Sequence, residues 1–301
     1  MQPLVTIGMS VFNCEETLCQ AMVSVLRQTY ENWQLLVFDD GSTDKTLDFA
    51  LSFDDSRVKV ISDGQNMGLP VRLNQAVALS RGKYFARMDG DDIAYPERLE
   101  RQVKFLKQHP NVDLVGSRVI IFEGEGEVVG SYPYRGTHAE ICSRPWASFY
   151  LPHPTWLGKI EWFRANPYRK EFKKTQDQEL LLRTYKYSRF ACIPDFLLGY
   201  RKVTLSLKTI LTGRYFFSLA LLRKAVAEKD RSLALGIPEH ALKSLVEIFA
   251  ITTGLNYKIL QHRAMPVAKR ELNRWKEVWT QCNSSGSTEQ RENWVVDKQR
   301  V

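Results

Sequence analysis

Three carboxylates, Asp89, Asp91 and Asp92, follow an apolar run at residues 84–88, with a single glycine among them. The run has the composition of a buried strand, so the acids lie where such a strand ends. Carboxylates this close repel one another, and a divalent cation that prefers oxygen ligands, Mg²⁺ or Mn²⁺, relieves the repulsion. Ligands of open α/β sheets bind outside the carboxyl ends of the strands. The pattern therefore indicates a cation site, with an acidic turn that begins a helix before Pro96 as the alternative.

A second pair of acids, Asp39 and Asp40, follows another strand-like run at residues 33–38. In a doubly wound sheet, the carboxyl ends of parallel strands lie along one edge and face one crevice. We therefore expect both acidic segments to border the same site. The sequence contains neither a GxGxxG fingerprint nor a GxxxxGKS/T loop, which excludes the usual dinucleotide and nucleoside-triphosphatase motifs.

The elements that carry these acids alternate in type over the first hundred residues. Strands are predicted at 5–12, 33–38, 58–61 and 84–88, and helices at 18–28, 44–51, 69–79 and 96–109. Such alternation predicts an α/β fold in which a parallel sheet carries helices on both faces.

Downstream, the sequence predicts shorter elements and then a helical region. Strands are expected at 112–116, 118–122, 190–194 and 196–201, with a turn at 123–130, a helix at 137–149, a loop at 171–178 and a helix at 179–185. Three helices follow at 208–227, 238–253 and 265–282, before a Ser/Gly-rich hinge at 283–288. We therefore expect a main domain at 1–205, a helical region at 206–282 and a flexible polar tail at 283–301.

Charge and cysteine content bound the partners and the compartment. The formal charge of the chain is +8, and residues 201–301 carry 18 Lys and Arg against 9 Asp and Glu. The six basic residues at 201–227, with no acid among them, fit a membrane surface; a solvated helical face is the alternative, and we expect no nucleic-acid partner.

Five cysteines without a CxxC pair favour reduced thiols in the cytoplasm. Neither a signal peptide nor a run of 18 apolar residues is found.

Several motifs occur in an order that resembles a known family. They are VTIGMSVFN, FDDGSTDKT, ARMDGDD, PERLERQ, HPT, QDQELLLR and GYRK, and they cover residues 4–203. In type and order they resemble glycosyltransferase family 2, the inverting nucleotide-sugar transferases. The resemblance implies the A-type glycosyltransferase fold, a Rossmann-like, mixed and mostly parallel sheet with helices on both faces, here followed by a C-terminal helical extension. It also makes residues 1–205 a nucleotide-sugar-binding catalytic domain.

The resemblance implies a role for each residue that matches the family motifs. Those expected to bind the nucleotide are Val11, Asn13, Glu15, Asp39 or Asp40, and Asp89. Asp91 matches the residue that binds Mg²⁺ or Mn²⁺ on the diphosphate, and Asp177 matches the general base. Gln176 stands where many members have Glu, and Val203 stands where the family has a His after the YR pair.

Further candidates rest on their position in the sequence. Asn66 and Arg72 follow the third strand and could approach the nucleotide, although a turn and a surface arginine explain them equally well. Asp92, His153 and Gln176 are candidate donor or acceptor contacts. His153 lies between two prolines, so a structural role is its alternative.

These features together predict an inverting, metal-dependent glycosyltransferase. It would transfer a sugar from a nucleotide-diphosphate donor, expected to be a UDP-sugar, to a hydroxyl of a glycan or lipid-linked acceptor in surface polysaccharide synthesis. A nucleotidyltransferase is one alternative, although its Gly-rich basic signature is absent from the N-terminus, and a non-catalytic nucleotide-sugar-binding module is another. We expect a cytoplasmic protein, peripheral on the inner face of the membrane through its C-terminal helices, and those helices could equally form a homodimer.

Overall fold

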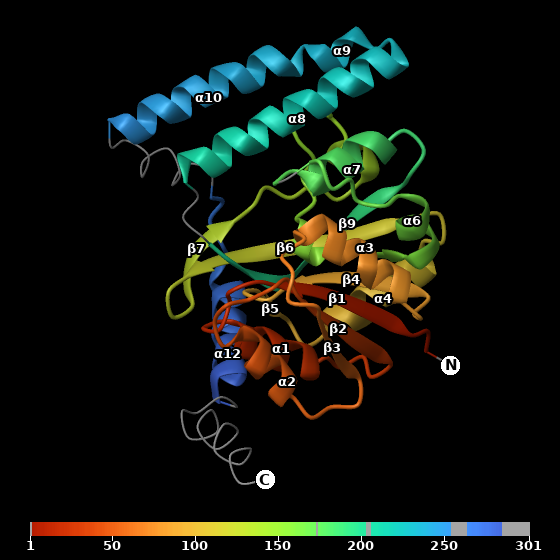
Figure 1. The fold of residues 1–301 in the computed structure, drawn as a ribbon, viewed down its shortest axis with the longest axis vertical. Helices are drawn as coiled ribbons and strands as arrows, with labels where there is room; N and C mark the ends of the chain where they lie inside the picture. Colours follow the sequence, from red (N-terminus) through yellow and green to blue (C-terminus); the bar gives the residue numbers. More distant parts are fainter. Residues whose placement is uncertain (1, 173, 203–205, 254–263, 285–301) are drawn as a thin grey trace.

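Four parallel strands form the half of the sheet that ends in acids. They lie in the order β3-β2-β1-β4 and comprise β1 (Val5–Val11), β2 (Trp33–Asp39), β3 (Val58–Ser62) and β4 (Tyr84–Asp89). The register pairs Val11 with Asp39 and Ser10 with Asp89, so the strands end along one edge. All four strands expected from the sequence are confirmed. The structure is a computed structural model that describes residues 2–172, 174–202, 206–253 and 264–284 (Figure 1).

Helices cover both faces of this half-sheet. α1 (Leu18–Leu26) and α4 (Arg98–Gln108) pack on one face and α3 (Leu69–Leu79) packs on the other, while α2 (Thr46–Ser52) connects β2 to β3 (Figure 1). Side chains alternate along a strand, so Ala86 and Met88 of β4 face α1 and α4, whereas Phe85 faces α3. Gly8 of β1 accommodates Phe85, because a Cβ there would lie 2.5 Å from the Phe85 ring.

The other half of the sheet is mixed. The strand order continues from β4 through β8 (Leu157–Lys159), β6 (Leu114–Glu123), β9 (Phe190–Arg201) and β5 (Ile93–Ala94), and β7 (Glu127–Ser131) pairs with β6. β6 and β9 are parallel, whereas β8 is antiparallel to both β4 and β6. The sheet is therefore parallel in its N-terminal half and mixed beyond it, in agreement with the expected fold class.

Two pairs of expected short strands turn out to be single strands. The segments 112–116 and 118–122 belong to β6, and the segments 190–194 and 196–201 belong to β9. The register of β6 and β9 shifts between Ser117 and Arg118, where Pro194 and Asp195 drop out of the ladder. Proline has no N–H to donate, so β9 bulges at Pro194 and then continues.

The segment between β7 and β9 departs most from the sequence prediction. The helix expected at 137–149 is wrong beyond α5 (His138–Ile141), because the residue before Pro145 disfavours helical backbone. A 3₁₀ turn, η1 (His153–Thr155), and α6 (Ile160–Ala165) were not expected. α7 (Gln176–Thr184) begins three residues before the expected position 179, so Gln176 and Asp177 lie in its first turn rather than in a loop.

The C-terminal helices divide into two groups at different ends of the molecule. α8 (Leu207–Glu228) and α10 (Gly236–Thr252) lie side by side, joined by the short α9 (Arg231–Ala234), and α8 packs on α7 (Figure 1). α12 (Lys269–Ser284) packs instead against α1, and Trp275 contacts Phe122 of β6. α12 includes the first two residues of the expected hinge, and the rest of the hinge and the tail lie outside the described residues. Among the described helices, none combines the length and apolar character needed to cross a bilayer.

Candidate active site

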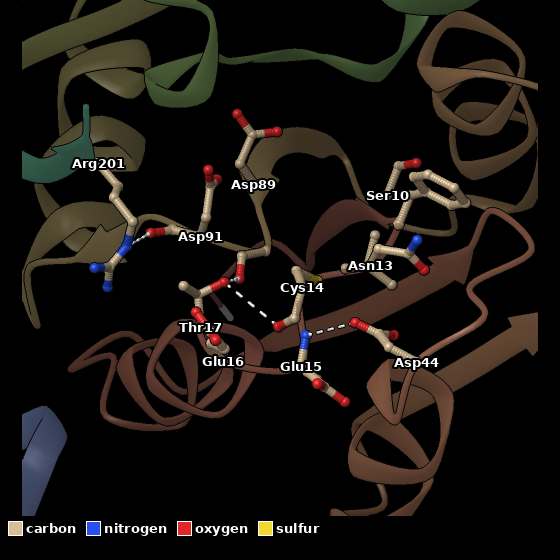
Figure 2. A pocket seen from close by; sticks show the side chains of 13 residues that line it. Ser10, Asn13, Cys14, Glu15, Glu16, Thr17, Asp44, Asp89, Asp91 and Arg201 are labelled. Carbon is tan, nitrogen blue, oxygen red and sulfur yellow. Dashed lines mark hydrogen bonds between the residues drawn. The ribbon is translucent and has the colours of Figure 1, made fainter. Parts of the chain in front are cut away.

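A cavity of about 470 Å³ opens at the carboxyl ends of β1 and β4 (Figure 2). The segment after β1 lines it together with Asp44 after β2, the acidic end of β4, and Arg201 at the end of β9. Figure 2 shows Asp89 and Asp91 projecting their carboxylates to the same side of the backbone. The volume lies in the range of small-molecule sites, so the cavity is the candidate binding site.

The acidic triplet has the geometry of a cation site. One carboxylate oxygen from each of Asp89, Asp91 and Asp92 lies within 4.8 Å of the others. Asp92 is buried; its Oδ1 accepts a hydrogen bond from the backbone N–H of Arg201 at 2.9 Å, whereas its Oδ2 is buried without a partner among the described residues. An all-oxygen set with an unsatisfied buried oxygen fits Mg²⁺ or Mn²⁺.

The electrostatics of the triplet point the same way. Burial, followed by the charge of Asp89, raises the pKa of Asp91 to about 6, against the lowering effect of Arg87 and Arg201. Burial and the charges of Asp89 and Asp91 raise the pKa of Asp92 well above its ordinary value. These carboxylates therefore carry their charges at a cost, and a bound cation would offset that cost.

Arg201 closes one side of the cavity, and the sequence analysis did not single it out. Its Nε donates to the backbone oxygen of Asp91 at 2.9 Å, and its Nη2 donates to Gln20 at 2.7 Å. The guanidinium also lies 4.6 Å from the centre of the Phe122 ring. The available signal was its place in the GYRK motif, whose arginine is the last residue of β9.

Asp177 shares electrostatic neighbours with the acidic triplet, but it is not among the residues that line the cavity. Burial raises the pKa of its carboxyl group, and the bond from Gln178 and the charge of Arg87 oppose that rise. The charge of Arg87 also lowers the pKa values of Asp91 and Asp92, and the charges of Asp177 and Asp89 both raise the pKa of Tyr168. Asp177 and the triplet, more than eighty residues apart in the sequence, therefore have Arg87 and Tyr168 as common electrostatic neighbours.

Arg87 was missed by the sequence analysis. Arg87 is 3% exposed and forms an ion pair with Asp89. A cation in the middle of an apolar strand was the available signal, because arginine is seldom fully buried without a partner.

His153 and Gln176 are both buried. Nε2 of His153 lies 2.9 Å from the Tyr168 hydroxyl, and the ring meets Trp156 edge to face. Burial, reinforced by Arg87, holds the pKa of His153 well below its ordinary value, so the ring is neutral. These contacts favour the structural alternative for His153, whose ring already has a hydrogen-bond partner.

The residues after β1 lie along the cavity wall. Val11 is buried at the end of β1, and Asn13 has a positive φ of 48°. Oδ1 of Asn13 accepts a bond from the Thr43 N–H at 2.9 Å, and Glu15 accepts one from the Lys45 N–H at 2.9 Å. These bonds join the β1 loop to the β2 loop and shape the cavity.

The acids after β2 do not line the cavity. Asp39 accepts bonds from the Ser42 N–H and the Ser62 hydroxyl. Asp40 accepts bonds from two backbone N–H groups, those of Met67 and Gly68, and from a buried guanidinium, that of Arg72. Both carboxylates are buried, so the expectation that they would border the same crevice as the triplet is not met in this conformation.

Arg72 is 1% exposed, so the alternative of a surface arginine is wrong. Its guanidinium binds both Asp40 and Asp63, and it donates to the backbone oxygen of Gln65. Asn66 is exposed in the same loop and is not among the residues that line the cavity. Arg72 therefore fixes the loop after β3 through these contacts.

The fold and the site together indicate the class of protein to which the chain belongs. A sheet with a parallel half and a mixed half, in which a parallel strand ends in clustered carboxylates beside a small-molecule cavity, fits the A-type glycosyltransferase architecture. The family model for Glycosyl transferase family 2 matches residues 6–166, which is more than half of the chain. The chain belongs to that family.

Curated relatives carry related descriptions. The putative glycosyltransferase EpsE of Bacillus subtilis is 38% identical over 146 residues, covering 46% of this chain and 52% of its own length. An uncharacterized glycosyltransferase of Haemophilus influenzae is 32% identical over 213 residues, covering 66% of this chain and 65% of its own. The Escherichia coli UDP-Glc:alpha-D-GlcNAc-diphosphoundecaprenol beta-1,3-glucosyltransferase WfgD is 36% identical, covering 43% and 50%. This chain therefore spans about half to two thirds of these relatives.

Solved structures share the fold at low sequence identity. Staphylococcus aureus TarS 1–349 in complex with UDP-GlcNAc has a TM-score of 0.61 and 18% identity, covering 93% of this chain and 81% of TarS 1–349. The mannosyltransferase PcManGT of Pyrobaculum calidifontis, in complex with GDP-Man and Mn²⁺, has a TM-score of 0.60 and 16% identity, covering 94% and 85%. These likenesses establish the fold of the present chain.

Proposed function

We propose that the protein is an inverting, metal-dependent glycosyltransferase. It transfers a sugar from a nucleotide-diphosphate donor, a UDP-sugar, to a hydroxyl group of a glycan or lipid-linked acceptor in surface polysaccharide synthesis. The observation that carries the proposal is the acidic triplet that ends β4 beside the cavity, with Arg87 as an electrostatic neighbour that it shares with the half-buried Asp177.

The donor side of the reaction uses the cavity and the acidic triplet. Asp89 and Asp91 would hold Mg²⁺ or Mn²⁺, with the orphaned oxygen of Asp92 behind them. The cation, when bound, neutralises charge on the leaving diphosphate. Val11, Asn13 and Glu15, which line the cavity, are the proposed nucleotide contacts.

The acceptor side of the reaction uses Asp177. Its carboxylate takes the proton of the acceptor hydroxyl while that oxygen attacks the anomeric carbon and the bond from this carbon to the diphosphate oxygen breaks. A single displacement of this kind inverts the anomeric configuration and requires no enzyme nucleophile. Burial raises the pKa of Asp177, which makes the carboxylate a stronger base than an exposed aspartate.

The related proteins support the choice of substrates. The name of WfgD describes transfer from UDP-Glc to a diphosphoundecaprenol-linked sugar, and TarS and PcManGT were solved with nucleotide sugars. PcManGT also holds Mn²⁺. A UDP-sugar donor, Mn²⁺ and a lipid-diphosphate-linked acceptor are therefore the first combination to assay.

Transfer from UDP-sugars to such an acceptor, with Mn²⁺ or with a chelator, tests the proposal. Asp177→Asn should lower kcat by about 10²- to 10⁴-fold, the usual contribution of a general base, while UDP binding is retained. Asp54→Asn, at an exposed position, serves as the control. Retention of the anomeric configuration in the product, or wild-type turnover by Asp177→Asn, would contradict the mechanism.

The α8–α10 hairpin is our proposed contact with an anionic membrane surface. In the apolar segment Tyr215–Leu222 of α8, Phe217, Ala220 and Leu221 are buried, whereas Tyr215 and Leu222 are exposed. The outward apolar stripe lies on α10, where five side chains are 47–69% exposed: Leu235, Leu242, Leu245, Val246 and Phe249. Their spacing places them on one helical face.

Charge complementarity favours a lipid surface. Every acid between residues 207 and 252 is paired with a base: Glu228, Asp230, Glu239 and Glu247. Lys208, Lys229 and Arg231 have no carboxylate partner in the described part of the chain, so the hairpin presents unpaired cations beside its apolar stripe. At Gly213, an added Cβ would lie 3.6 Å from Thr175, so α8 adjoins the helix that carries Asp177. A membrane contact next to the helix of the proposed general base suits an acceptor that is held in the membrane by its lipid.

Flotation with anionic and neutral vesicles tests the membrane contact. We expect the protein to float with anionic vesicles at low salt, and Phe249→Asp to lose that binding. Leu51→Asp, an exposed apolar residue on α2, should leave vesicle binding intact. Unchanged flotation of Phe249→Asp, with a shift from dimer to monomer in sedimentation, would instead identify a second copy of the chain as the occupant.

A further inference from the structure

We infer that α12 is part of the donor site, and that Arg201 is the positioning residue through which it acts. The guanidinium of Arg201 fixes the backbone of Asp91 beside Asp92, and side chains of α12 fix the guanidinium. The inference rests on the proposed function, because the role of these acids as cation ligands belongs to that proposal.

Arg201 bonds to two adjacent acids of the triplet. It is the last residue of β9, it is half-buried, and it lines the cavity. Its backbone N–H donates to Oδ1 of Asp92 at 2.9 Å, and its Nε donates to the backbone oxygen of Asp91 at 2.9 Å. Figure 2 shows this second bond on one side of Asp91 and the Asp91 carboxylate on the other. Arg201 therefore holds the backbone of Asp91 while the carboxylate faces the cavity.

The guanidinium of Arg201 is held at each of its nitrogens and by two aromatic rings. Nη1 donates to the backbone oxygen of Gly124 at 3.3 Å, and Nη2 donates to the side chain of Gln20 at 2.7 Å. The guanidinium carbon lies 4.6 Å from the centre of the Phe122 ring and 5.8 Å from that of the Trp279 ring. A cation over an aromatic face is attracted at these distances. A guanidinium held in this way has few other positions, so its bond to the Asp91 backbone is fixed as well.

α12 supplies one of the two rings and supports the bond to Gln20. Trp279 and Asn283 lie one turn apart on α12, and the Asn283 side chain donates to the backbone oxygen of Trp279 at 2.8 Å. Gln20 of α1 in turn donates to Oδ1 of Asn283 at 2.6 Å. Gln20 is buried, so its amide needs partners within the protein, and Arg201 and Asn283 are such partners. The helix therefore reaches Arg201 by two routes.

A buried tryptophan anchors α12 to the sheet. Trp275 is 1% exposed, its ring centre lies 4.7 Å from that of Phe122, and its Nε1 donates to the backbone oxygen of Gly126 at 2.7 Å. Gly199 of β9 makes room for this ring, because a Cβ there would overlap it. Gly199 lies two residues before Arg201. α12 is therefore fixed against the strand that carries Arg201.

The sign of the effect on cation binding separates positioning from charge. The guanidinium is a cation beside a proposed cation site, so its charge alone opposes the binding of Mn²⁺. Removing that charge should tighten Mn²⁺ binding, whereas the loss of a positioning contact should weaken it. Trp279 carries no charge, so its replacement tests the geometry alone.

Electron paramagnetic resonance of free Mn²⁺, titrated into the full chain without UDP, measures the Mn²⁺ dissociation constant. The titration is done well above the Asp91 pKa of about 6, so that protons do not compete with the cation. Arg201→Gln should weaken Mn²⁺ binding about 10- to 100-fold, the usual cost of removing a group that orients a metal ligand. Trp279→Leu should weaken it severalfold, and Trp279→Phe, which keeps an aromatic face, should restore most of the affinity.

Trp162→Leu on α6 is the matched control. It makes the same substitution at a buried tryptophan whose ring contacts, Phe163 and Phe190, belong to a hydrophobic cluster without α12. It should lower the melting temperature and leave the Mn²⁺ dissociation constant unchanged. If it weakens Mn²⁺ binding as much as Trp279→Leu does, general destabilisation explains the effect and the inference is overturned.

The remaining outcomes separate the inference from the proposed function. If the wild type binds Mn²⁺ and Arg201→Gln binds it equally or more tightly, the inference is overturned and the cation site stands. Unchanged affinity in Trp279→Leu overturns the role of α12, and if that variant does not fold, Asn283→Ala decides in the same way. A wild type that binds no Mn²⁺ contradicts the cation site of the proposed function instead.

Discussion

β1 lies between β2 and β4, and both of these neighbours end in acids, yet the two ends are built differently. The acids after β2, Asp39 and Asp40, are surrounded by donors from three loops and from Arg72. The acids after β4 crowd one another, and one of their buried oxygens has no donor among the described residues. Asp92 is as buried as Asp39 and Asp40, whereas Asp89 and Asp91 are half-buried, so the number of donors distinguishes the two regions more clearly than burial does.

The pKa shifts have opposite signs in the two regions. A side-chain hydrogen bond from Arg72 lowers the pKa of Asp63, beside the β2 acids, to about 2. Burial and the charge of Asp89 raise the pKa of Asp91 to about 6. The acids at the end of β2 have their hydrogen-bond partners within the protein. The acids at the end of β4 repel one another, and a bound cation would relieve that repulsion.

The largest difference should follow from Asp91→Asn. Losing one cation ligand should lower the Mn²⁺-dependent transfer rate by about 10²- to 10³-fold, the scale of removing one electrostatic stabiliser. The same change should raise the free energy of unfolding without metal by about 1–3 kcal/mol, because a buried charge disappears. Initial rates and urea denaturation measure the two effects. A wild-type transfer rate together with a lower free energy of unfolding in Asp91→Asn would mean that the acids of β4 are structural, like those of β2.

Asp40→Asn should act in the opposite direction. The buried guanidinium of Arg72 would lose one of its two carboxylates, which should lower the free energy of unfolding by about 2–3 kcal/mol. The rise in melting temperature that Mn²⁺ and UDP produce should persist in the folded variant. Urea denaturation and a thermal shift assay measure these quantities. If Mn²⁺ and UDP no longer raised the melting temperature of Asp40→Asn, the cation would bind near β2 instead.

The pH dependence of the metal-free protein sharpens the comparison. The folded pKa of Asp91 lies above its ordinary value of 3.8, so its contribution is fully present below pH 3.8 and is lost as pH rises through about 6. We expect this contribution to fall by about 1–3 kcal/mol over that window. Unfolding in chelator at several pH values, with Asp91→Asn as reference, isolates it. A difference between the two proteins that does not vary with pH would contradict the raised pKa.

Ser62→Ala should have the smallest effect. It removes one of the donors to buried Asp39, at 2.8 Å, and should lower the free energy of unfolding by about 1 kcal/mol. The response to Mn²⁺ should be unchanged, because Ser62 does not line the cavity. A weakened Mn²⁺ response would mean that the two strand ends act as one site.

The parallel half of the fold could be predicted from the sequence, because strand and helix periods alternate there and two of the strands, β2 and β4, end in recognisable acids. The helix expected at 137–149 was wrong because Pro145 outweighs the local apolar pattern. The short strands of β9 were separated at Pro194, since a sequence pattern does not reveal that a bulge lets a strand continue.

Part of the candidate site could be predicted as well. Asp89, Asp91 and Asp92 form a local cluster, whereas the role of Asp177 comes from the family resemblance and stays a prediction. Arg201 could not be placed beside Asp91 from the sequence, because the two are brought together by the pairing of β5 with β9. Whether Asp40 was free or already bound by Arg72 likewise depended on packing.

The central claim is that the acids after β4 hold a cation that binds the diphosphate of the donor. Calorimetric titration of UDP into the wild type and into Asp91→Asn, each with Mn²⁺ and with chelator, tests it most directly. The account predicts binding to the wild type only when Mn²⁺ is present, and a large loss of that binding in Asp91→Asn. Equal UDP affinity in chelator, or full Mn²⁺-dependent binding by Asp91→Asn, would contradict it.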